Sequence, residues 1–192
     1  MKILFISDIH GITTNLNVIE KIMTEGNIDK LVCLGDLYYP GPSYDNKYEI
    51  DSKGVFNFLM KYQEKLICMM GNCDSLVDIK ASDFPIGSGV SLINTDGLDI
   101  YITHGNEYNF EKDRKFNRKG ILVYGHEHIS YIKKKDNMIY INVGSISLPR
   151  NDNNPTYAVY EKKKIFSLPA VFAGSHTADA SIHSGCICTR HG

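Results

Sequence analysis

Seven side chains that can bind a divalent metal ion stand at the ends of five short apolar runs in the sequence. They are carboxylates, a carboxamide and imidazoles: Asp8, His10, Asp36, Asn72, His104, His126 and His128. Their ligand atoms are oxygen and nitrogen, and no thiolate is required, a set that suits first-row divalent ions. Seven ligands are too many for one ion, so two ions that share a carboxylate fit the pattern better.

Each of these residues also has an ordinary structural explanation. An aspartate after a strand is usually a turn residue or a helix cap, and a single histidine is usually a hydrogen-bonded polar residue. The distribution of histidines favours the metal site. The chain has seven histidines, and all four that precede residue 169 stand where an apolar run ends.

The apolar runs are rich in Ile, Leu, Val and aromatic residues and are too short for helices. They predict strands at Lys2–Ser7, Lys30–Leu34, Lys65–Met70, Ile100–Thr103 and Ile121–Tyr124. Apolar residues at helical spacing predict helices over Thr13–Glu25 and Lys53–Tyr62. Strands that alternate with helices predict βαβ crossovers and a largely parallel sheet, whose carboxyl edge is the usual place for a ligand. Glycines at positions 35, 71, 105 and 125 fit tight turns around a crowded centre.

The second half of the chain predicts three β-hairpins. The first joins Ser91–Asn94 to Leu98–Thr103 through Asp96-Gly97. The others join 131–135 to 138–143 and 157–160 to 164–168. The sequence therefore predicts an α/β half followed by a β-rich half, both of which contribute strands to one domain with two sheets.

Length and charge exclude several classes of protein. A chain of 192 residues with 43% hydrophobic residues and a net charge of −1 predicts one folded domain without a global positive field for nucleic acid or an anionic membrane. Its apolar stretches are far shorter than the roughly 18 residues that span a bilayer. An early aspartate argues against a signal peptide, and apolar runs around Cys33 and Cys68 agree with a reducing compartment, so we expect a cytoplasmic protein.

The composition changes near Ser167. No lysine follows Lys164 and no asparagine follows Asn154. We therefore expect a functional domain over residues 1–168 and a C-terminal tail over 169–192 that is non-native or disordered. A less favoured interpretation of this tail is a small metal site made by His183, Cys186, Cys188 and His191.

As a set, the motifs resemble the calcineurin-like metallophosphoesterase superfamily. The family pattern is present in order as Asp8-Ile9-His10, Gly35-Asp36, Gly71-Asn72-Cys73-Asp74, His104 and Gly125-His126-Glu127-His128. The short length, the GNCD motif and Thr103-His104-Gly105 are similar to the compact YfcE-type phosphodiesterases of bacteria and archaea. The resemblance covers residues 1 to about 168. It implies an α/β fold in four layers, an α-β-β-α sandwich of two mixed sheets.

The resemblance also implies the ligands of each ion. It assigns one ion to Asp8, His10, Asp36 and His128, and the other to Asp36, Asn72, His104 and His126, so that Asp36 bridges the two. Two ions about 3.5–4 Å apart would activate a hydroxide that attacks phosphorus in line. The resemblance favours manganese, although nickel, cobalt, iron and zinc suit the same ligands. The catalytic residues that it implies are Asp36, Asn72, Cys73, Asp74 and His104.

Cys73 departs from the better known members of the superfamily, which have a histidine there as a leaving-group acid or as a stabiliser of the transition state. A thiol with a pKa near ~8.5 is a poor substitute, and Cys73 equally fits the role of a space-filling residue. The group that protonates the leaving group therefore stays open. Asp74 is expected to orient a ligand or a neighbouring side chain.

The function expected from these residues is hydrolysis of a small phosphodiester. A phosphomonoesterase acting on a nucleotide or a phosphoprotein is the alternative among enzymes. A third alternative is a protein-interaction scaffold like the retromer subunit of this fold, but that interpretation predicts lost ligands and all seven positions are filled. Tyr38-Tyr39 directly after the Asp36 motif fits either a structural turn or stacking on an aromatic group of the substrate. Membrane and nucleic-acid partners are not expected. The oligomeric state and the natural substrate stay open.

Overall fold

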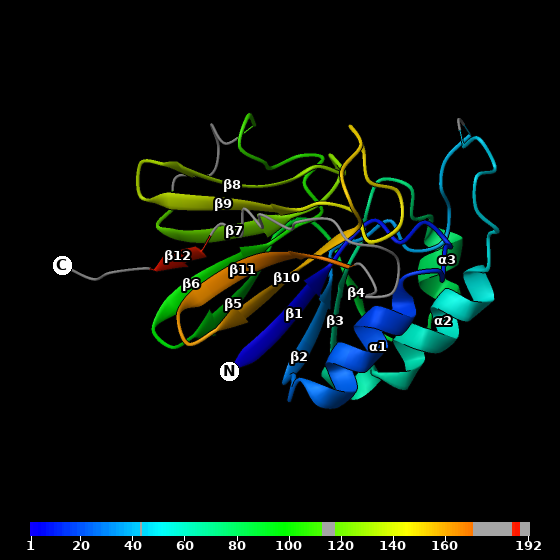
Figure 1. Cartoon of the computed structure of the whole chain (residues 1–192), viewed down its shortest axis with the longest axis horizontal. Helices are drawn as coiled ribbons and strands as arrows, with labels where there is room; N and C mark the ends of the chain where they lie inside the picture. Colours follow the sequence, from blue (N-terminus) through cyan, green and yellow to red (C-terminus); the bar gives the residue numbers. More distant parts are fainter. Residues whose placement is uncertain (43, 113–117, 171–185, 189–192) are drawn as a thin grey trace, which may run out of the picture.

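Two mixed β-sheets form the framework of the protein in this computed structural model, which describes residues 1–42, 44–112, 118–170 and 186–188. Figure 1 shows the two sheets as neighbouring layers, with the helices gathered beside the first sheet. In that sheet the strand order is β12-β11-β10-β1-β2-β3-β4, and in the second it is β5-β6-β7-β9-β8. The prediction of two mixed sheets is confirmed.

The first sheet joins the two ends of the domain. Its parallel part is β1 (Lys2–Ile6), β2 (Lys30–Cys33), β3 (Leu66–Met69) and β4 (Ile86–Gly87). Its antiparallel part is β10 (Thr156–Glu161), β11 (Lys164–Pro169) and β12 (Cys186–Cys188). Strand β10 lies antiparallel beside β1, with Leu4 opposite Val159.

The hairpin β10–β11 lies in the first sheet, and the second sheet contains the other two predicted hairpins. Its strands are β5 (Ser91–Thr95), β6 (Leu98–Ile102), β7 (Gly120–Tyr124), β8 (Ser130–Lys135) and β9 (Met138–Val143). Asp96 and Gly97, between β5 and β6, both have a positive φ, as a two-residue type I′ turn requires. All three predicted hairpins are confirmed by their registers.

Among the described residues, three α-helices cover the outer face of the first sheet (Figure 1). They are α1 (Leu16–Glu25), α2 (Ser52–Lys61) and α3 (Leu76–Ala81), and a 3₁₀ turn at Gln63–Lys65 precedes β3. The first helix begins at Leu16, three residues later than predicted, because the amide of Leu16 bonds the carbonyl of Thr13 in a preceding turn. Neither α3 nor β4 was predicted from the sequence.

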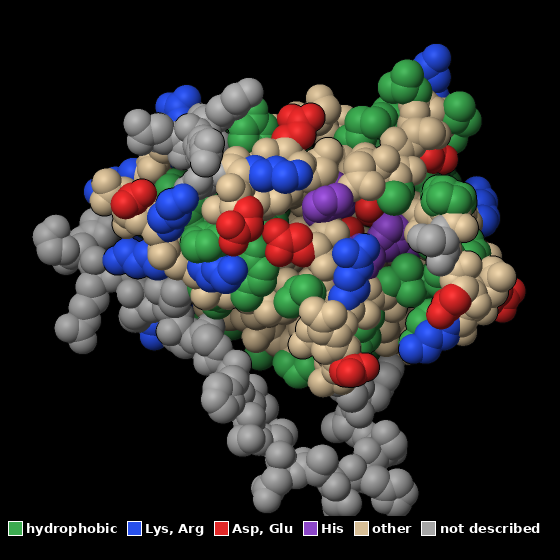
Figure 2. Space-filling view, turned by 90° about the horizontal axis from the view of Figure 1, so that it is seen from above, with side chains coloured by type: hydrophobic (Ala, Val, Ile, Leu, Met, Phe, Trp, Pro, Cys, Tyr) green, Lys and Arg blue, Asp and Glu red, His purple; other side chains and the backbone are tan. Residues whose placement is uncertain are grey.

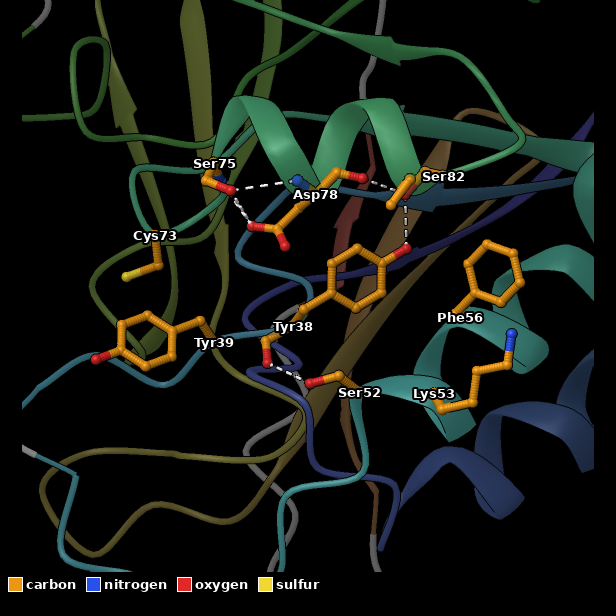
Figure 3. Close-up of a pocket in the computed structure, with 10 residues that line it drawn as sticks. Tyr38, Tyr39, Ser52, Lys53, Phe56, Cys73, Ser75, Asp78 and Ser82 are labelled. Carbon is orange, nitrogen blue, oxygen red and sulfur yellow. Dashed lines mark hydrogen bonds between the residues drawn. The ribbon is translucent and has the colours of Figure 1, made fainter.

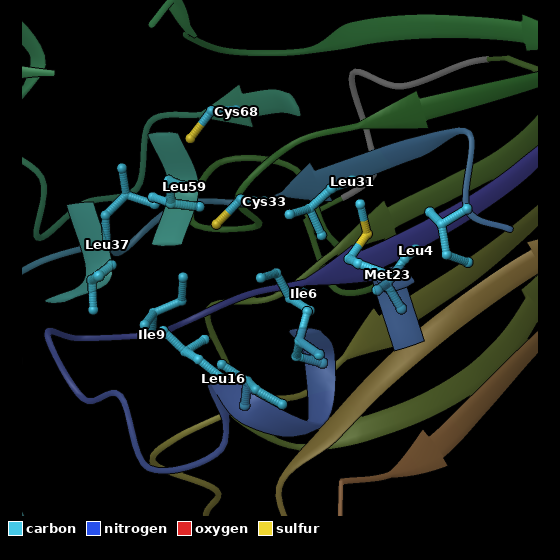
Figure 4. Packing of buried hydrophobic residues seen from close by; sticks show 14 of the residues in the cluster. Leu4, Ile6, Ile9, Leu16, Met23, Leu31, Cys33, Leu37, Leu59 and Cys68 are labelled. Atoms are coloured by element: carbon cyan, nitrogen blue, oxygen red, sulfur yellow. The ribbon is translucent and has the colours of Figure 1, made fainter. Parts of the chain in front are cut away.

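The alternating side chains of β1 separate two hydrophobic clusters. Leu4 and Ile6 point toward the helices, where they pack with Leu16, Leu31 and Leu59 (Figure 4). Ile3 and Phe5 belong to the cluster between the two sheets. The central strand is therefore buried on both faces, which holds the loop that follows it in a fixed position.

The outer face of the second sheet has a smaller aromatic cluster. Leu122, Tyr124 and Tyr140 pack there against Tyr108 and Phe110, which lie in the segment after β6. Within the described part of the chain, the layer on this face contains no helix, so three layers of the predicted sandwich are regular elements and the fourth is an irregular segment.

The end of the chain pairs with the first sheet through β12, at the register Lys164 to Cys188. Residues 171–185 and 189–192 lie outside the described part, as do the side chains of the alternative Cys/His site. The boundary at residue 168 stays a prediction. No helix among the described residues has the length and apolar character needed to cross a membrane.

Candidate metal centre

The strands of both sheets deliver the predicted ligands to one edge of the structure. Asp8 and His10 follow β1, Asp36 follows β2, and Asn72 follows β3 in the first sheet. The histidines at 104, 126 and 128 follow β6 and β7 in the second sheet. Because the two sheets face each other, ligands that are more than 100 residues apart meet, as the His10 and His128 rings do at a centroid distance of 5.0 Å.

Asp36 occupies the middle of this cluster. Its Oδ2 lies 3.7 Å from Nε2 of His10 and 3.5 Å from Nε2 of His104. Its Oδ1 accepts a hydrogen bond of 2.8 Å from the amide of Cys73. The carboxylate thus lies between a histidine of the first sheet and a histidine of the second.

The imidazoles of three site histidines are fixed by backbone carbonyls. Nδ1 of His10 lies 2.7 Å from the carbonyl of Tyr39, and Nδ1 of His104 lies 2.9 Å from that of Leu34. Nδ1 of His128 lies 2.5 Å from the carbonyl oxygen of residue 148. A carbonyl oxygen can only accept, so each Nδ1 carries the hydrogen and each Nε2 lone pair points into the site.

The atoms that face one another in the site are therefore acceptors. Nε2 of His10 and Nε2 of His128 are 3.1 Å apart, and Nε2 of His104 lies 2.9 Å from Oδ1 of Asn72. Oδ1 of Asp8 is buried and has no hydrogen-bond partner among the described residues, although His128 Nε2 is 3.3 Å away. Facing lone pairs and an unpartnered carboxylate oxygen repel one another unless a cation or a proton lies between them, so this ligand set fits divalent metal ions.

Three groups of possible ligand atoms lie within 4.8 Å of one another in the described part of the chain. They are Asp8/His10/His128, His10/Asp36/Cys73 and Asp8/Asp36/His104. His126 belongs to none of them. Its ring lies 5.1 Å from that of His104, and its amide donates a 2.9 Å hydrogen bond to Oδ2 of Asp8.

Most of the cluster is buried, and one side of it faces solvent. Asp8, His10, Asp36 and His104 are at most 2% exposed. Asn72 is exposed, and Cys73 and His126 are partly exposed. Figure 2 shows histidine side chains at the surface beside acidic ones on this face of the molecule. A substrate would therefore approach from the side of β3 and β7.

Burial and the neighbouring histidines control the charge of Asp8. Burial alone would raise the pKa of its carboxyl, but the neighbouring imidazoles, His128 first and then His104 and His10, lower that pKa to about 2. Burial lowers the pKa of His128, but its contacts with Asp8 outweigh this effect and raise it. Burial and then the charge of His104 lower the pKa of His126. Asp8 thus offers an anionic carboxylate to the cluster at neutral pH.

Cys73 has the opposite shift. Burial, followed by the charge of Asp36, raises the pKa of the Cys73 thiol to about 12. Its sulfur accepts a 3.4 Å hydrogen bond from the side-chain Nδ2 of Asn72. The side chain is a neutral thiol at the solvent side of the cluster.

Asp74 binds backbone rather than side chains. Its Oδ2 accepts hydrogen bonds of 2.8 Å from the amides of Asp36 and Gly71, and its Oδ1 accepts one of 2.7 Å from the amide of Leu37. Burial raises the pKa of this carboxyl, and the three amides oppose that effect. Asp74 joins the loop after β2 to the loop after β3.

Five of the seven predicted ligands have a left-handed backbone. The φ angles lie between 54° and 68° at Asp8, His10, Asp36, His126 and His128. Positive φ is uncommon outside glycine and costs about 1–3 kcal/mol where it is strained, and such positions concentrate at functional sites. The backbone thus turns sharply after each strand and points the side chain into the cluster.

Glycines allow the loops to come this close together. A Cβ at Gly125 would lie 2.0 Å from Oγ of Ser7 and 2.4 Å from Oδ2 of Asp8. A Cβ at Gly71 would lie 2.1 Å from Oδ1 of Asp36. The prediction that the backbone at these glycines comes close to a crowded centre is confirmed at both positions.

Some groups that shape the site were not predicted from the sequence. The carbonyls of residues 34, 39 and 148 orient the imidazoles, and Ser145 donates a hydrogen bond of 2.8 Å to the carbonyl of Asp8. Backbone carbonyls are present in every residue, so no residue type marks them in advance.

The family follows from a comparison of the sequence with known families. Residues 1–164 match the model described as the calcineurin-like phosphoesterase superfamily domain. The chain belongs to the calcineurin-like phosphoesterase superfamily. This family implies divalent metal ions, and the acceptor-only cluster described above fits them.

Individual members of the superfamily are similar over most of their length. The phosphodiesterase YfcE of Escherichia coli K12 is 29% identical, over 84% of this chain and 88% of that protein. The probable metallophosphoesterase MG207 of Mycoplasma genitalium is 25% identical, over 83% and 86%. The solved structure of YfcE superposes with a TM-score of 0.82 at 28% identity and covers 88% of this chain and 93% of that one.

A more distant likeness concerns the fold alone. Vps29 of Entamoeba histolytica, solved with Zn²⁺, has a TM-score of 0.63 at 18% identity and covers 97% of both chains. The α/β metallophosphoesterase fold predicted from the sequence is thereby confirmed.

Proposed function

We propose that this protein is a phosphodiesterase that uses two divalent metal ions to hydrolyse a small diester. The observation that carries the proposal is the position of Asp36, whose Oδ2 lies within 3.7 Å of Nε2 of both His10 and His104. One carboxylate oxygen between two imidazoles is the arrangement expected of a ligand shared by two ions.

The proposed ligands of the first ion are Asp8, His10, Asp36 and His128, and those of the second are Asp36, Asn72, His104 and His126. The contact between His10 and His128 supports the first set, and the contact between His104 and Asn72 supports the second. When bound, such ions supply Lewis acidity and an activated water at neutral pH. Manganese is the proposed ion, and nickel, cobalt, iron and zinc suit the same ligands.

The residues of the chain hold this centre in a fixed geometry. Backbone carbonyls orient three imidazoles, so these rings need not rotate when a metal ion binds. Asp74 is proposed as a positioning residue, because it fixes the amides of Asp36 and Gly71. Asn72 is a neutral ligand, which leaves two carboxylates against four metal charges and a net positive site for a phosphate.

The diester is favoured over the monoester for two reasons. The similar protein from E. coli carries the name phosphodiesterase. Cys73 stands beside the candidate metal ligands, and its thiol, whose pKa burial and the charge of Asp36 raise to about 12, is a weak proton donor for a leaving group. A diester with a good leaving group depends less on such a donor.

Turnover of two chromogenic esters tests this proposal. Chelated protein should hydrolyse neither bis-p-nitrophenyl phosphate nor p-nitrophenyl phosphate, and added Mn²⁺ should restore hydrolysis of the diester in preference to the monoester. Preference for the monoester would support a phosphomonoesterase instead. Absence of turnover, with Mn²⁺ binding shown by calorimetry, would favour a protein-interaction scaffold.

Substitution of Gly71 by alanine should weaken metal binding by at least about tenfold. The new Cβ would lie 2.1 Å from Oδ1 and 2.3 Å from N of Asp36, so the proposed bridging carboxylate must move. Calorimetric titration with Mn²⁺ measures the effect. Gly87→Ala is the matched control, because its Cβ would meet no atom closer than 3.4 Å. Unchanged Mn²⁺ affinity in Gly71→Ala would contradict the proposed role of Asp36.

A further inference from the structure

A pocket of about 590 Å³ lies between α2, α3 and the loop after β2 (Figure 3). We call it the α2–α3 pocket. Its aromatic lining residues are Tyr38, Tyr39 and Phe56, and Cys73 lines it on the side of the candidate metal centre. Its volume is in the range of sites for small molecules, which are mostly apolar with a few polar groups.

The polar side chains of the α2–α3 pocket bond mainly to one another. The hydroxyl of Tyr38 lies 2.8 Å from Oγ of Ser82, and Ser52 donates a 2.8 Å hydrogen bond to the carbonyl of Tyr38. Ser75 and Asp78 form a capping box at the start of α3. Groups that are already paired offer little to a polar ligand, so the surface left for contact is chiefly aromatic.

The charges of the pocket also balance. Lys53 and Asp78 are its two charged residues, and they have opposite signs. The ammonium of Lys53 lies 4.3 Å from the ring centroid of Phe56, where a cation–π contact holds it. The pocket therefore favours an uncharged, flat group over an anion.

One end of the pocket touches the metal centre. Figure 3 shows Cys73 and Tyr39 together at one end and Phe56 with Lys53 at the other. The amide of Cys73 donates to Asp36, and the carbonyl of Tyr39 faces Nδ1 of His10. A phosphate held by the metal ligands would thus direct one of its organic groups past Tyr39 into the pocket.

The two tyrosines after Asp36 have different roles in this structure. Tyr38 is half-buried and bonded to α3 through Ser82, so it is a wall of the pocket. The side chain of Tyr39 is 50% exposed. Covering its aromatic ring with another apolar group would remove that surface from water, which is favourable. An aromatic ring that enters the pocket would provide that cover.

We propose that the α2–α3 pocket binds an uncharged aromatic group of the substrate, with Tyr39 as the stacking and specificity-determining residue. The proposal rests on the proposed function, because the phosphate at the metal centre brings the aromatic group to the pocket. It narrows the substrate to an aryl or nucleoside diester.

Calorimetry with two phosphonates tests the pocket without relying on turnover. Phenylphosphonate and methylphosphonate both present a phosphoryl-like group, and only the first has a ring. With Mn²⁺-loaded protein, phenylphosphonate should bind at least fivefold more tightly than methylphosphonate. Tyr39→Ala should reduce that ratio by about fivefold, toward one, as expected for loss of one aromatic stack, and Tyr39→Phe should retain it. Leu92→Ala removes another exposed apolar side chain, in β5, and should leave the ratio unchanged.

Each outcome bears on one proposal or on both. Equal affinity for the two phosphonates in the unchanged protein, or equal weakening of both by Tyr39→Ala, would overturn the pocket as an aromatic site. If bis-p-nitrophenyl phosphate is still hydrolysed in that case, the phosphodiesterase proposal stands. If neither phosphonate binds and neither chromogenic ester is hydrolysed, both proposals are wrong.

Discussion

Asp36→Asn is expected to lose both the response to metal and nearly all diester hydrolysis. A neutral amide in place of a shared carboxylate removes one negative charge from both proposed ions at once. We expect kcat/KM for bis-p-nitrophenyl phosphate to fall by roughly a thousandfold or more, since metal ions contribute several kcal/mol to such reactions. Asn has nearly the same shape as Asp, so the hydrogen bond from the amide of Cys73 can be kept.

Thermal melting separates lost metal binding from lost folding. A ligand that binds only the native state raises its melting temperature, so Mn²⁺ should stabilise the unchanged protein. The metal-free variant should melt within a few degrees of the metal-free parent, and Mn²⁺ should no longer raise its melting temperature. Asp83→Asn is the control, because Asp83 is exposed outside the cluster and its replacement should change neither property. Substantial turnover in Asp36→Asn would contradict a shared carboxylate.

Asp74→Ala is expected to have the largest effect on stability among the site residues. Its buried carboxylate accepts hydrogen bonds from three backbone amides, and deletion leaves all three without that partner. Hydrogen bonds to a charged group contribute about 1.5–3 kcal/mol each, so we expect a loss of at least ~4 kcal/mol. For a chain of this length, the melting temperature should fall by roughly 8–16 °C.

Asp51→Ala is the matched control for this experiment. The Asp51 side chain also accepts from a backbone amide, that of Gly54 at the start of α2, but it makes only one such bond and is exposed. Loss of this cap should cost about 0.5–2 kcal/mol. Equal destabilisation by the two substitutions, measured by urea unfolding, would show that Asp74 does not join the two loops in the way described.

The sequence predicted the ligands because of where they stand along the chain. No single structural role explains why a histidine or an aspartate directly follows each of several apolar runs. In a parallel sheet, however, these positions all lie at the same edge. The structure brings Asp8, His10, Asp36, His104 and His128 within reach of one another. His126 lies beside His104 but outside those groups. The role of all seven residues as metal ligands stays a prediction.

The elements that escaped prediction are those without a hydrophobic pattern. Helix α3 is six residues long and has no buried side chain, so no apolar periodicity marks it. A capping box between Ser75 and Asp78 marks its start, and the Ser-x-x-Asp spacing was the available signal. Strand β4 has two residues, too few for any pattern.

The order of strands in space was also beyond the sequence pattern. Periodicity identifies a strand and its buried face, but the choice of neighbour depends on packing over the whole domain. The pairing of β10 with β1 is such a choice. It places the hairpin β10–β11 in the first sheet, whereas the other two hairpins lie in the second. The positions of the backbone carbonyls that orient the imidazoles also depend on packing over the whole domain.

The pairing of β1 with β10 has a consequence for the order in which the protein is made. The ribosome releases β1 early, but its antiparallel neighbour emerges only after all seven candidate ligands have been synthesised. Contacts of such high sequence separation form slowly, because a long loop must close first. During translation, Asp8 and Asp36 are therefore present before β10 can pair with β1, and the edge of β1 is still open. We expect nascent chains that stop before residue 156 to expose that edge and to require protection by chaperones.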